Sequence, residues 1–276
     1  MSITIVTGGA SGIGRSLAAE LAGRGDTVII ADIDAAGAAE TAERLNGRFD
    51  GKAFAAALDV TDADAVRDLY RQVAHDHGRL DLVFNNAGIA VAGLVEELTL
   101  AHWHRAIEIN LKGVVHGVDA AYRIMLEQGS GHIVNTASLA GLFPMPLGLP
   151  YTATKHAVVG LSLGLRAEAA TRGIKVSAVC PGFVDTSLLK TVNSGLPETG
   201  MSSKPEAAGD ETPNKSLYSP DAMARDIVKG VARNRALIVA PASGRIAWRA
   251  MRVSPRLAVR LGRIAVKGYL KEHGLD

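Results

Sequence analysis

The sequence of 276 residues predicts an α/β protein built on a doubly wound parallel sheet. Short apolar or β-branched runs alternate with helix-like segments over roughly the first 240 residues. Runs such as 28–30 and 82–84 are apolar throughout, as expected for strands with both faces covered by helices. The first run leads directly into a glycine-rich turn, which is typical of a strand that passes into a helix at a phosphate site.

The predicted elements follow in a regular order along the chain. Apolar runs predict strands at 3–7, 27–31, 52–58, 80–84, 132–137, 175–179 and 236–240. Helical periodicity predicts helices at 13–24, 35–46, 63–77, 101–128, 151–172 and 221–234. We therefore expect one domain over 1–242, followed by a basic amphipathic helical extension over 243–276.

Residues 190–219 interrupt this pattern. Their composition changes to Ser, Gly, Pro, Asn and charged residues, with few apolar side chains. A structureless insertion of this length in a compact domain is usually either a lid over a binding site or a disordered segment. We therefore predict a substrate lid at 190–219.

The composition limits the class of protein. The chain is 47% hydrophobic and 21% charged, which excludes the disordered class. Its only cysteine is Cys180, which excludes both an internal disulfide and a cysteine metal cluster. The N-terminus has no signal-peptide pattern, and no segment has the pattern of a membrane span. We therefore expect a cytoplasmic protein.

The net charge of +2 is unevenly distributed. Residues 243–276 contain eight basic and two acidic residues, so this segment carries +6 and the rest −4. The basic residues recur every three or four positions, which predicts one stripe along a helix. Such a stripe could contact an anionic membrane surface, pack in an oligomer or attract an anionic substrate. No nucleic-acid-binding motif accompanies it, so we do not expect nucleic acid as a partner.

The first strand–helix turn reads TGGASGIG at residues 7–14. Glycines allow a pyrophosphate to approach the backbone, and the start of the helix offers free N–H groups to the anion. We expect contacts from Gly8, Ser11, Gly12, Ile13 and Gly14. A glycine-rich turn without a ligand is the alternative, but the position between a strand and a helix favours a dinucleotide.

Asp32 follows the second strand, 18 residues after Gly14. A carboxylate there can hydrogen-bond the ribose hydroxyls of a dinucleotide and would repel a 2′-phosphate. No basic residue occurs at 33–36, so the sequence favours NAD over NADP. Asp34 can cap the next helix by itself, which leaves Asp32 for the ribose.

Tyr151 and Lys155 are four residues apart on a predicted helix and therefore share one face. A phenol has a pKa of about 10, and a nearby ammonium group lowers it. Ser138 follows the preceding strand, at the sheet edge where open parallel sheets bind ligands. Together these three residues predict acid–base chemistry at that edge.

The histidine pairs do not predict a metal site. His75 and His77, like His102 and His104, are two residues apart, and such pairs do not face each other on a helix. We expect ordinary solvated histidines and no metal.

From these residues, the sequence resembles the short-chain dehydrogenase/reductase family over residues 1 to about 186. The family's motifs occur in order: TGxxxGxG at 7–14, an acid in Leu-Asp-Val at 58–60, NNAG at 85–88, the asparagine at 110, the serine at 138, YxxxK at 151–155 and PGxxxT at 181–186. The resemblance implies a Rossmann-type sheet of about seven strands in the order 3-2-1-4-5-6-7, and a homodimer or homotetramer. It adds these cofactor contacts: Asp59, Val60, Asn86, Ala87, Gly88, Tyr151, Lys155, Pro181, Gly182, Val184 and Thr186.

The resemblance also implies a catalytic tetrad. Tyr151 would be the general acid/base, and Lys155 would lower its pKa and contact the nicotinamide ribose. Ser138 would hold and polarise the substrate oxygen. Asn110 would support a water that relays protons to Lys155.

The segment between Ser138 and Tyr151 is uncharged and almost entirely apolar. The resemblance to the family implies that this segment lies on the substrate side. We therefore expect Leu142, Phe143, Met145 and Leu149 to line the substrate site beside Ser138 and Tyr151, although the segment could instead pack only against its neighbours. The sequence thus predicts an NAD-dependent oxidoreductase that interconverts an apolar secondary alcohol and a ketone. The alternatives are an NADP-dependent reductase of 3-oxoacyl thioesters and a dinucleotide-binding regulatory protein without catalysis.

Overall fold

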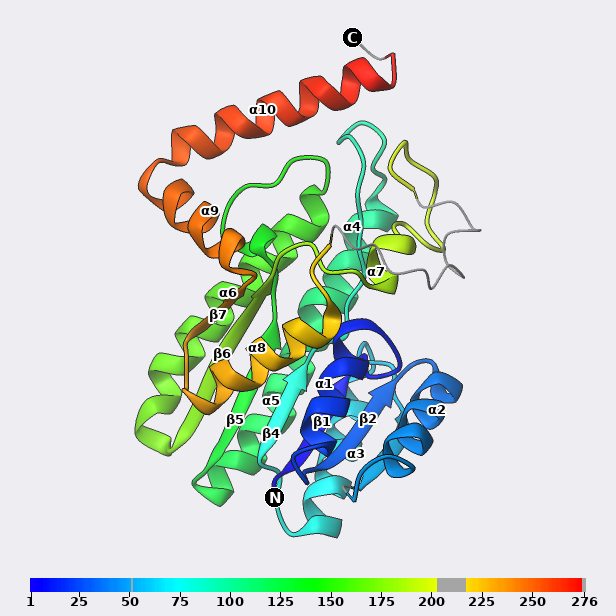
Figure 1. The fold of residues 1–276 in the computed structure, drawn as a ribbon, viewed down its shortest axis with the longest axis vertical. Coiled ribbons are helices and arrows are strands. Elements are labelled where there is room, and N and C mark those ends of the chain that lie inside the picture. Colours follow the sequence, from blue (N-terminus) through cyan, green and yellow to red (C-terminus); the bar gives the residue numbers. More distant parts are fainter. Residues whose placement is uncertain (51, 203–216, 275–276) are drawn as a thin grey trace.

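The computed structural model describes residues 1–50, 52–202 and 217–274. Within them, seven parallel strands form one sheet of order β3-β2-β1-β4-β5-β6-β7 (Figure 1). The strands are β1 (Ile3–Thr7), β2 (Thr27–Asp32), β3 (Ala53–Ala57), β4 (Leu82–Asn85), β5 (Gly131–Thr136), β6 (Ile174–Pro181) and β7 (Leu237–Ala240). The predicted fold class and strand order are confirmed.

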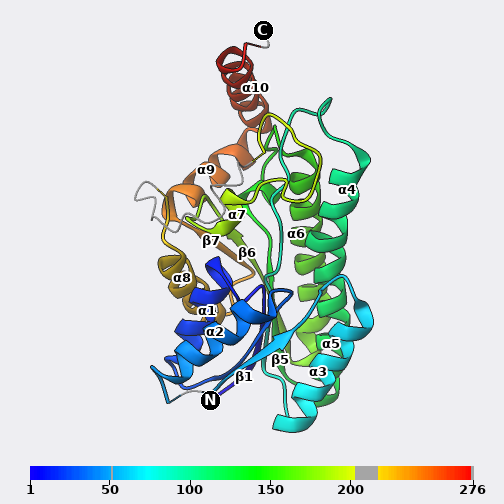
Figure 2. The same cartoon turned by 90° about the vertical axis from the view of Figure 1, so that its right-hand side faces the viewer.

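Helices cover both faces of the sheet (Figure 2). On one face lie α1 (Gly12–Ala22), α2 (Ala35–Asn46) and α8 (Pro220–Ala232). On the other lie α3 (Ala63–His77), α5 (Gly113–Gln128) and α6 (Leu149–Ala169), which the short helix η3 (Ala170–Arg172) extends. Four shorter helices complete this part of the fold: α4 (Leu100–Ile107), η1 (Glu108–Lys112), η2 (Leu139–Gly141) and α7 (Ser187–Lys190).

The continuous apolar runs are explained by this layered arrangement. On β1, Ile5 packs into the core under α3 and α5, and its neighbour Val6 packs into the core under α1 and α8. Successive strand side chains point to opposite faces, so both must be apolar when both faces are covered. All five residues of β1 are buried. The sheet therefore holds its carboxyl edge, where the loops carry the candidate site, in fixed positions.

The single helix predicted at 101–128 is wrong in one respect. The structure divides it into α4, one π-helical turn at η1, and α5. The π turn adds a residue to the helix and turns Asn110 inward, where it is fully buried. Such turns have no local sequence signature and occur frequently at functional sites.

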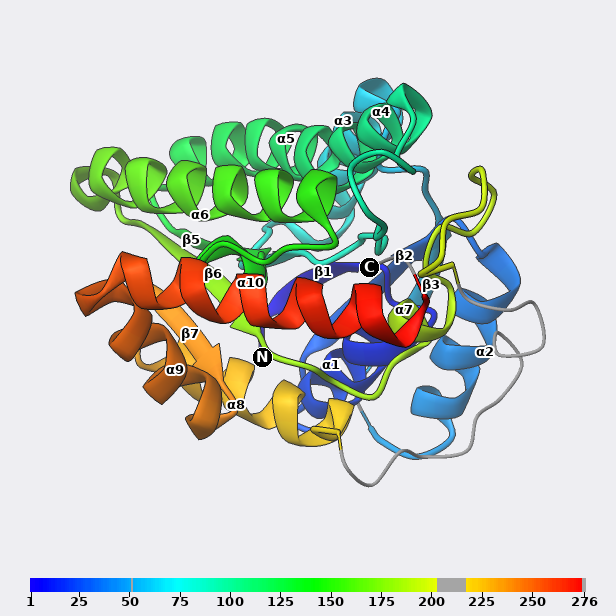
Figure 3. The same cartoon turned by 90° about the horizontal axis from the view of Figure 1, so that it is seen from above.

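The C-terminal extension consists of two helices, α9 (Ala242–Val253) and α10 (Pro255–Glu272). Ser254 and Pro255 separate them, since proline can begin a helix but cannot continue one. α10 lies beyond the carboxyl edge of the sheet and crosses the molecule there (Figures 1 and 3). Among the described residues, no helix is long and apolar enough to cross a membrane.

The predicted lid at 190–219 is described only in part, because residues 203–216 lie outside the described residues. Residues 191–202 form turns that are held against the loop after β4 by Asn193. The Asn193 amide donates to the Ala92 carbonyl at 2.6 Å and accepts from the Ala92 N–H at 3.1 Å. This part of the segment is thus fixed to the body at the carboxyl edge.

Candidate active site

The glycine-rich loop after β1 is shaped for close backbone approach. Gly8 has φ +67°, and a Cβ there would come within 2.9 Å of the Ala87 Cα. A Cβ on Gly14 would lie 2.0 Å from the Gly8 carbonyl oxygen. Only glycine fits at these two positions. The loop and the segment 86–88 therefore meet without side chains between them, as a dinucleotide cradle requires.

The start of α1 is open to an anion. Ser11, at the N-cap, makes no capping hydrogen bond, whereas the side chains of Asp34 and Asp62 cap α2 and α3. The Ser11 hydroxyl instead pairs with the hydroxyl of Ser187 at 3.1 Å, across from the loop. The N–H groups of Gly12, Ile13 and Gly14 thus receive no side-chain cap, which fits a pyrophosphate.

Asp32 adjoins this loop at the end of β2. Its carboxylate accepts from the Ala10 N–H at 2.9 Å and from the Asp34 N–H at 3.0 Å. Asp34 caps α2 through the Gly37 N–H, as predicted. Asp32 therefore does not cap the helix, and each of its oxygens keeps a lone pair for a ribose hydroxyl.

Thr7 joins the glycine-rich loop to the segment 86–88. Its hydroxyl accepts from the N–H groups of Asn86 at 2.9 Å and Ala87 at 3.1 Å. The Asn86 amide in turn donates to the Thr7 carbonyl at 3.0 Å. Thr7 begins the glycine-rich motif, but the motif alone does not indicate that its hydroxyl joins the two segments.

The two remaining cofactor segments lie at the same edge. The Asp59 carboxylate accepts from the Thr61 N–H and hydroxyl, and the Thr61 backbone bond lowers the pKa of Asp59. The adjacent Val60 carbonyl pairs with the His116 ring at 2.9 Å. In the segment 181–186, Thr186 approaches the loop: a Cβ on Gly12 would lie 3.2 Å from the Thr186 Cβ.

Lys155 and Tyr151 share one face of α6, as the spacing predicts. The Lys155 Nζ lies 5.5 Å from the centroid of the Tyr151 ring and donates to the Thr136 carbonyl at 2.9 Å. The Lys155 side chain is buried, and Tyr151 is half-buried. Thr136, at the end of β5, thus orients the ammonium group, a role that the sequence motifs did not indicate.

Asn110 closes the site from the π turn. Its side chain accepts from the Ile89 N–H at 2.8 Å and donates to the Ile89 carbonyl at 3.0 Å. A Cβ on Gly88 would lie 3.0 Å from the Asn110 Oδ1 and 3.5 Å from the Lys155 Nζ. Asn110 and Lys155 therefore lie close together. A side chain at position 88 would occupy the space between them, and Gly88 has none.

Burial sets the proton affinities of the central pair. It lowers the pKa of Lys155 from 10.5 to about 8. It raises the pKa of Tyr151, and the hydrogen bond with Ser138 opposes that rise. The sequence predicts the opposite direction for Tyr151. The loss of solvent around the phenol outweighs the effects that would favour phenolate.

Ser138 and Cys180 lie beside this pair. The Ser138 hydroxyl, which acts on the pKa of Tyr151, accepts from the Ala140 N–H at 3.1 Å. Cys180 is fully buried, and burial raises the pKa of its thiol from 9.0 to about 12. Cys180 is therefore a neutral packing residue and not a thiolate nucleophile.

The apolar segment between Ser138 and Tyr151 forms the rim of the site. Phe143 and Met145 are half-buried, and Leu149 is exposed at the start of α6. Leu142 packs against the small core of α5, α6 and β6. For this residue the structure shows the packing against neighbours that was the alternative to lining the substrate site. Its exposed fraction still leaves room for contact with a ligand.

His102 corrects the prediction that the paired histidines are solvated. It is fully buried and joins α4 to the segment 191–202. The Thr99 N–H donates to its Nδ1 at 3.1 Å, so the proton is on Nε2, which donates to the Pro197 carbonyl at 3.0 Å. Pro197 is 95 positions away, and no local pattern could have shown this contact. Among the described residues, no group of three or more His, Cys, Asp or Glu side chains could hold a metal ion.

The doubly wound sheet, the uncapped loop at the start of α1 and the Tyr151–Lys155 pair together define a dinucleotide-binding protein of the Rossmann class. The residues present fit a nicotinamide dinucleotide along the carboxyl edge of β1, β2, β4 and β5.

Comparison with known proteins then places the chain in one family. The family model for short chain dehydrogenases matches residues 2–197. The crystal structure of a short-chain dehydrogenase/reductase from Burkholderia phymatum in complex with NAD superposes with a TM-score of 0.80, at 28% identity over 93% of this chain and 94% of that one. A short-chain dehydrogenase from Sphingobium yanoikuyae in complex with NADPH gives 0.76, at 25% identity over 93% and 94%. The chain belongs to the short-chain dehydrogenase/reductase family.

Curated relatives agree on the reaction class. The probable oxidoreductase EphD of Mycobacterium tuberculosis is 35% identical over 268 residues, which are 94% of this chain and 45% of EphD. This chain thus spans less than half the length of that relative. The 3-oxoacyl-[acyl-carrier-protein] reductase FabG of Staphylococcus aureus is 37% identical over 206 residues, 74% of this chain and 82% of FabG. Both relatives are thus named as oxidoreductases or reductases, and the two solved neighbours hold a nicotinamide nucleotide.

Proposed function

We propose that this oxidoreductase interconverts an apolar secondary alcohol and its ketone, with NAD as the cofactor. The observation that carries the proposal is the placement of Tyr151. Its phenol lies near enough to the Ser138 hydroxyl for that group to lower its pKa, its ring faces the Lys155 ammonium, and it follows an uncharged rim in the sequence. A proton donor next to an apolar rim suits a substrate whose only polar group is its reacting oxygen.

The side chains of this site divide the work. Tyr151 gives a proton to the substrate oxygen in reduction and takes one in oxidation, and Ser138 holds that oxygen by a hydrogen bond. Lys155, fixed by the Thr136 carbonyl, holds a cofactor ribose and supplies positive charge beside the phenol. Asn110 fixes Ile89 and with it the loop after β4. The bound nicotinamide supplies the hydride chemistry, and the protein supplies position and electrostatics.

The position of Asp32 supports NAD over NADP. Its carboxylate is anchored to the glycine-rich loop by the Ala10 N–H at 2.9 Å, and the next residue, Ile33, is exposed. A 2′-phosphate at this point would face a carboxylate without a basic partner in the segment 33–36. Ribose hydroxyls, which can donate to that carboxylate, suit the site better.

A substrate panel tests the proposal. Secondary alcohols and ketones of increasing apolar size are offered with NADH/NAD and with NADPH/NADP, and cofactor absorbance is followed. We expect turnover to rise with apolar size, and kcat/KM to be at least about tenfold higher with NAD, since repelling the phosphate costs more than about 1.4 kcal/mol. Polar sugar alcohols are the matched controls and should react poorly.

The same panel includes a 3-oxoacyl thioester, because FabG is among the relatives. A higher kcat/KM for the thioester with NADPH than for any simple ketone with NADH would contradict the proposal and favour a reductase of acyl thioesters. Turnover of no compound with either cofactor, despite dinucleotide binding, would favour the non-catalytic alternative.

A further inference from the structure

Helix α10 contacts the rest of the protein along one side only. Ala258 is buried, and a Cβ on Gly262 would lie 3.6 Å from Pro146 in the rim of the candidate site. Two turns further along α10, the Tyr269 hydroxyl lies directly against Gly200. These positions, 258, 262 and 269, fall on the same side of a helix. They fix which side of α10 faces the body and which faces away.

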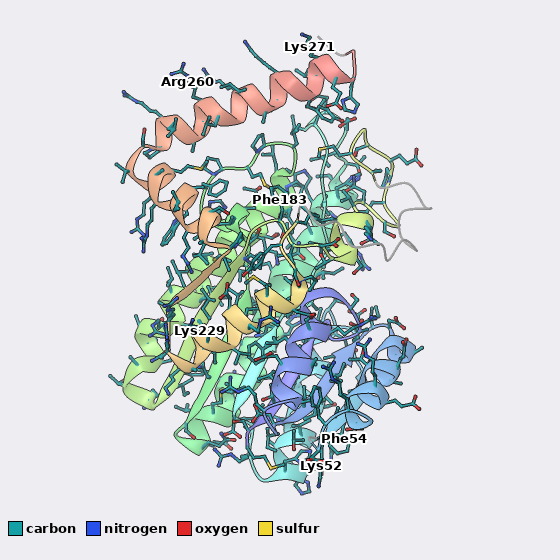
Figure 4. The ribbon with its side chains drawn as sticks, in the orientation of Figure 1. Lys52, Phe54, Phe183, Lys229, Arg260 and Lys271 are labelled. Atoms are coloured by element: carbon teal, nitrogen blue, oxygen red, sulfur yellow. The ribbon has the colours of Figure 1, made fainter. Side chains whose placement is uncertain are left out.

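The side that faces away is basic. Arg256, Arg260, Lys267 and Lys271 recur at intervals of four and seven residues, so they form one row opposite the body contacts. All four are exposed, and Arg260 and Lys271 point away from the body (Figure 4). Within the described part of the chain, no ion pair involves a side chain of α10.

An apolar stripe runs directly beside this basic row. Leu257, Leu261 and Ile264 are 39%, 43% and 59% exposed. Their spacing of four and three residues places them on one line next to the row. Nothing among the described residues covers this line. Apolar side chains that remain exposed in a row beside a basic stripe mark an interaction surface.

The charges decide what fits this surface. In a symmetric dimer through this face, each subunit would present the same basic row to its partner, and like charges would meet at close range. An anionic lipid surface offers negative headgroups for the row and an apolar boundary for the stripe. We propose that the outward side of α10 docks on an anionic lipid surface, with the carboxyl edge of the sheet turned toward the bilayer.

Vesicle sedimentation with the full chain tests this directly. Vesicles contain either phosphatidylcholine alone or equal parts of phosphatidylcholine and phosphatidylglycerol. We expect binding to the mixed vesicles and little to phosphatidylcholine alone, with the bound fraction falling as salt screens the charges. The absence of binding to the mixed vesicles would overturn the proposal.

A charge-matched pair of variants locates the contact. Arg260→Glu with Lys271→Glu should weaken vesicle binding at least about tenfold, since each charge near the surface contributes about 1 kcal/mol. Lys52→Glu with Lys229→Glu makes the same change in net charge at exposed sites on the body (Figure 4) and should bind like the wild type. Equal weakening in both variants would mean that net charge, not α10, governs binding.

Ile264→Ser tests the apolar stripe without a change in charge. We expect weaker binding to mixed vesicles at high salt, where the apolar contribution dominates. Sedimentation velocity without lipid is measured on every variant. If the α10 variants instead dissociate an oligomer while vesicle binding stays unchanged, the face is a subunit interface and the proposal fails.

Discussion

At the scale of single residues, burial determines which group holds a proton. Lys155 and Tyr151 are both removed from water, and their pKa values move in opposite directions: that of Lys155 falls to about 8 and that of Tyr151 rises. Near neutral pH the phenol therefore keeps its proton. A protonated phenol is the form that reduction of a ketone needs, so oxidation should become faster as pH rises.

His132 gives a measurable consequence of burial. Its Nε2 pairs with the Ser177 hydroxyl at 2.8 Å between β5 and β6, and burial lowers the pKa of His132 from 6.5 to about 4. As pH falls through this range, the unfolded chain binds the proton first, so stability is lost. We expect His132 to account for about 2 kcal/mol of lost unfolding free energy between about pH 7 and pH 5.

Urea unfolding of the wild type and of His132→Gln measures this loss. A glutamine amide can donate to the Ser177 hydroxyl, which itself donates to the Arg235 carbonyl, but it does not titrate. The variant should therefore lose about 2 kcal/mol less than the wild type over that range. Parallel pH profiles for the two proteins would contradict the assignment.

The residues that we propose to be catalytic could be located from the sequence because each lies in a local motif with a fixed spacing. The direction of the Tyr151 pKa shift could not be predicted, because it depends on how far folding buries the phenol, which the spacing of Tyr151 and Lys155 does not show. Thr136 was missed for a similar reason: its role depends on its backbone carbonyl, and any residue carries one.

At the scale of elements, two features were not predicted: the π turn at η1 and the contacts that hold residues 191–202. Both involve contacts between segments that are distant in sequence. The π turn at η1 turns Asn110 toward Ile89, which lies 21 positions earlier, and a periodic pattern cannot show this. Residues 191–202 are held by hydrogen bonds across segments: Asn193 and Thr199 both donate to the Ala92 carbonyl, and His102 bonds to the Pro197 carbonyl. Strand and helix positions were predictable because the spacing of apolar residues can be read from a short stretch of sequence.

Asn193 offers a test of how this segment is held. It has φ +59°, and its side-chain amide bonds to Ala92, Thr199 and Ser202. Asn193→Gly keeps the backbone conformation and removes all these bonds. We expect amide hydrogen exchange across 191–202 to become at least about tenfold faster, while the sheet is unaffected.

A second asparagine with positive φ supplies the control. Asn234, with φ +48°, lies after α8 and bonds to Arg166. Asn234→Gly should leave exchange at 191–202 unchanged. Exchange in Asn193→Gly that matches the wild type would show that other contacts hold the segment.

At the scale of the whole molecule, the uneven charge seen in the sequence has a place in space. The basic extension lies across the carboxyl edge of the sheet, the same edge that carries the candidate site (Figure 3). The sequence indicated a basic stripe, but which side of α10 faces the body depends on Pro146 and Gly200, which no pattern within the helix reveals. The strand order followed from the family resemblance. The homodimer or homotetramer and the cytoplasmic location stay predictions.

The measurement that tests the account most directly is the turnover of Tyr151→Phe on the best substrate of the panel, with NADH binding followed separately by fluorescence. The variant removes one hydroxyl and keeps the ring that faces Lys155. We predict that NADH binds as in the wild type and that kcat falls by about 100- to 10,000-fold, the contribution expected of a general acid/base. Turnover near the wild-type rate would contradict the central claim, because another group would then have to transfer the proton.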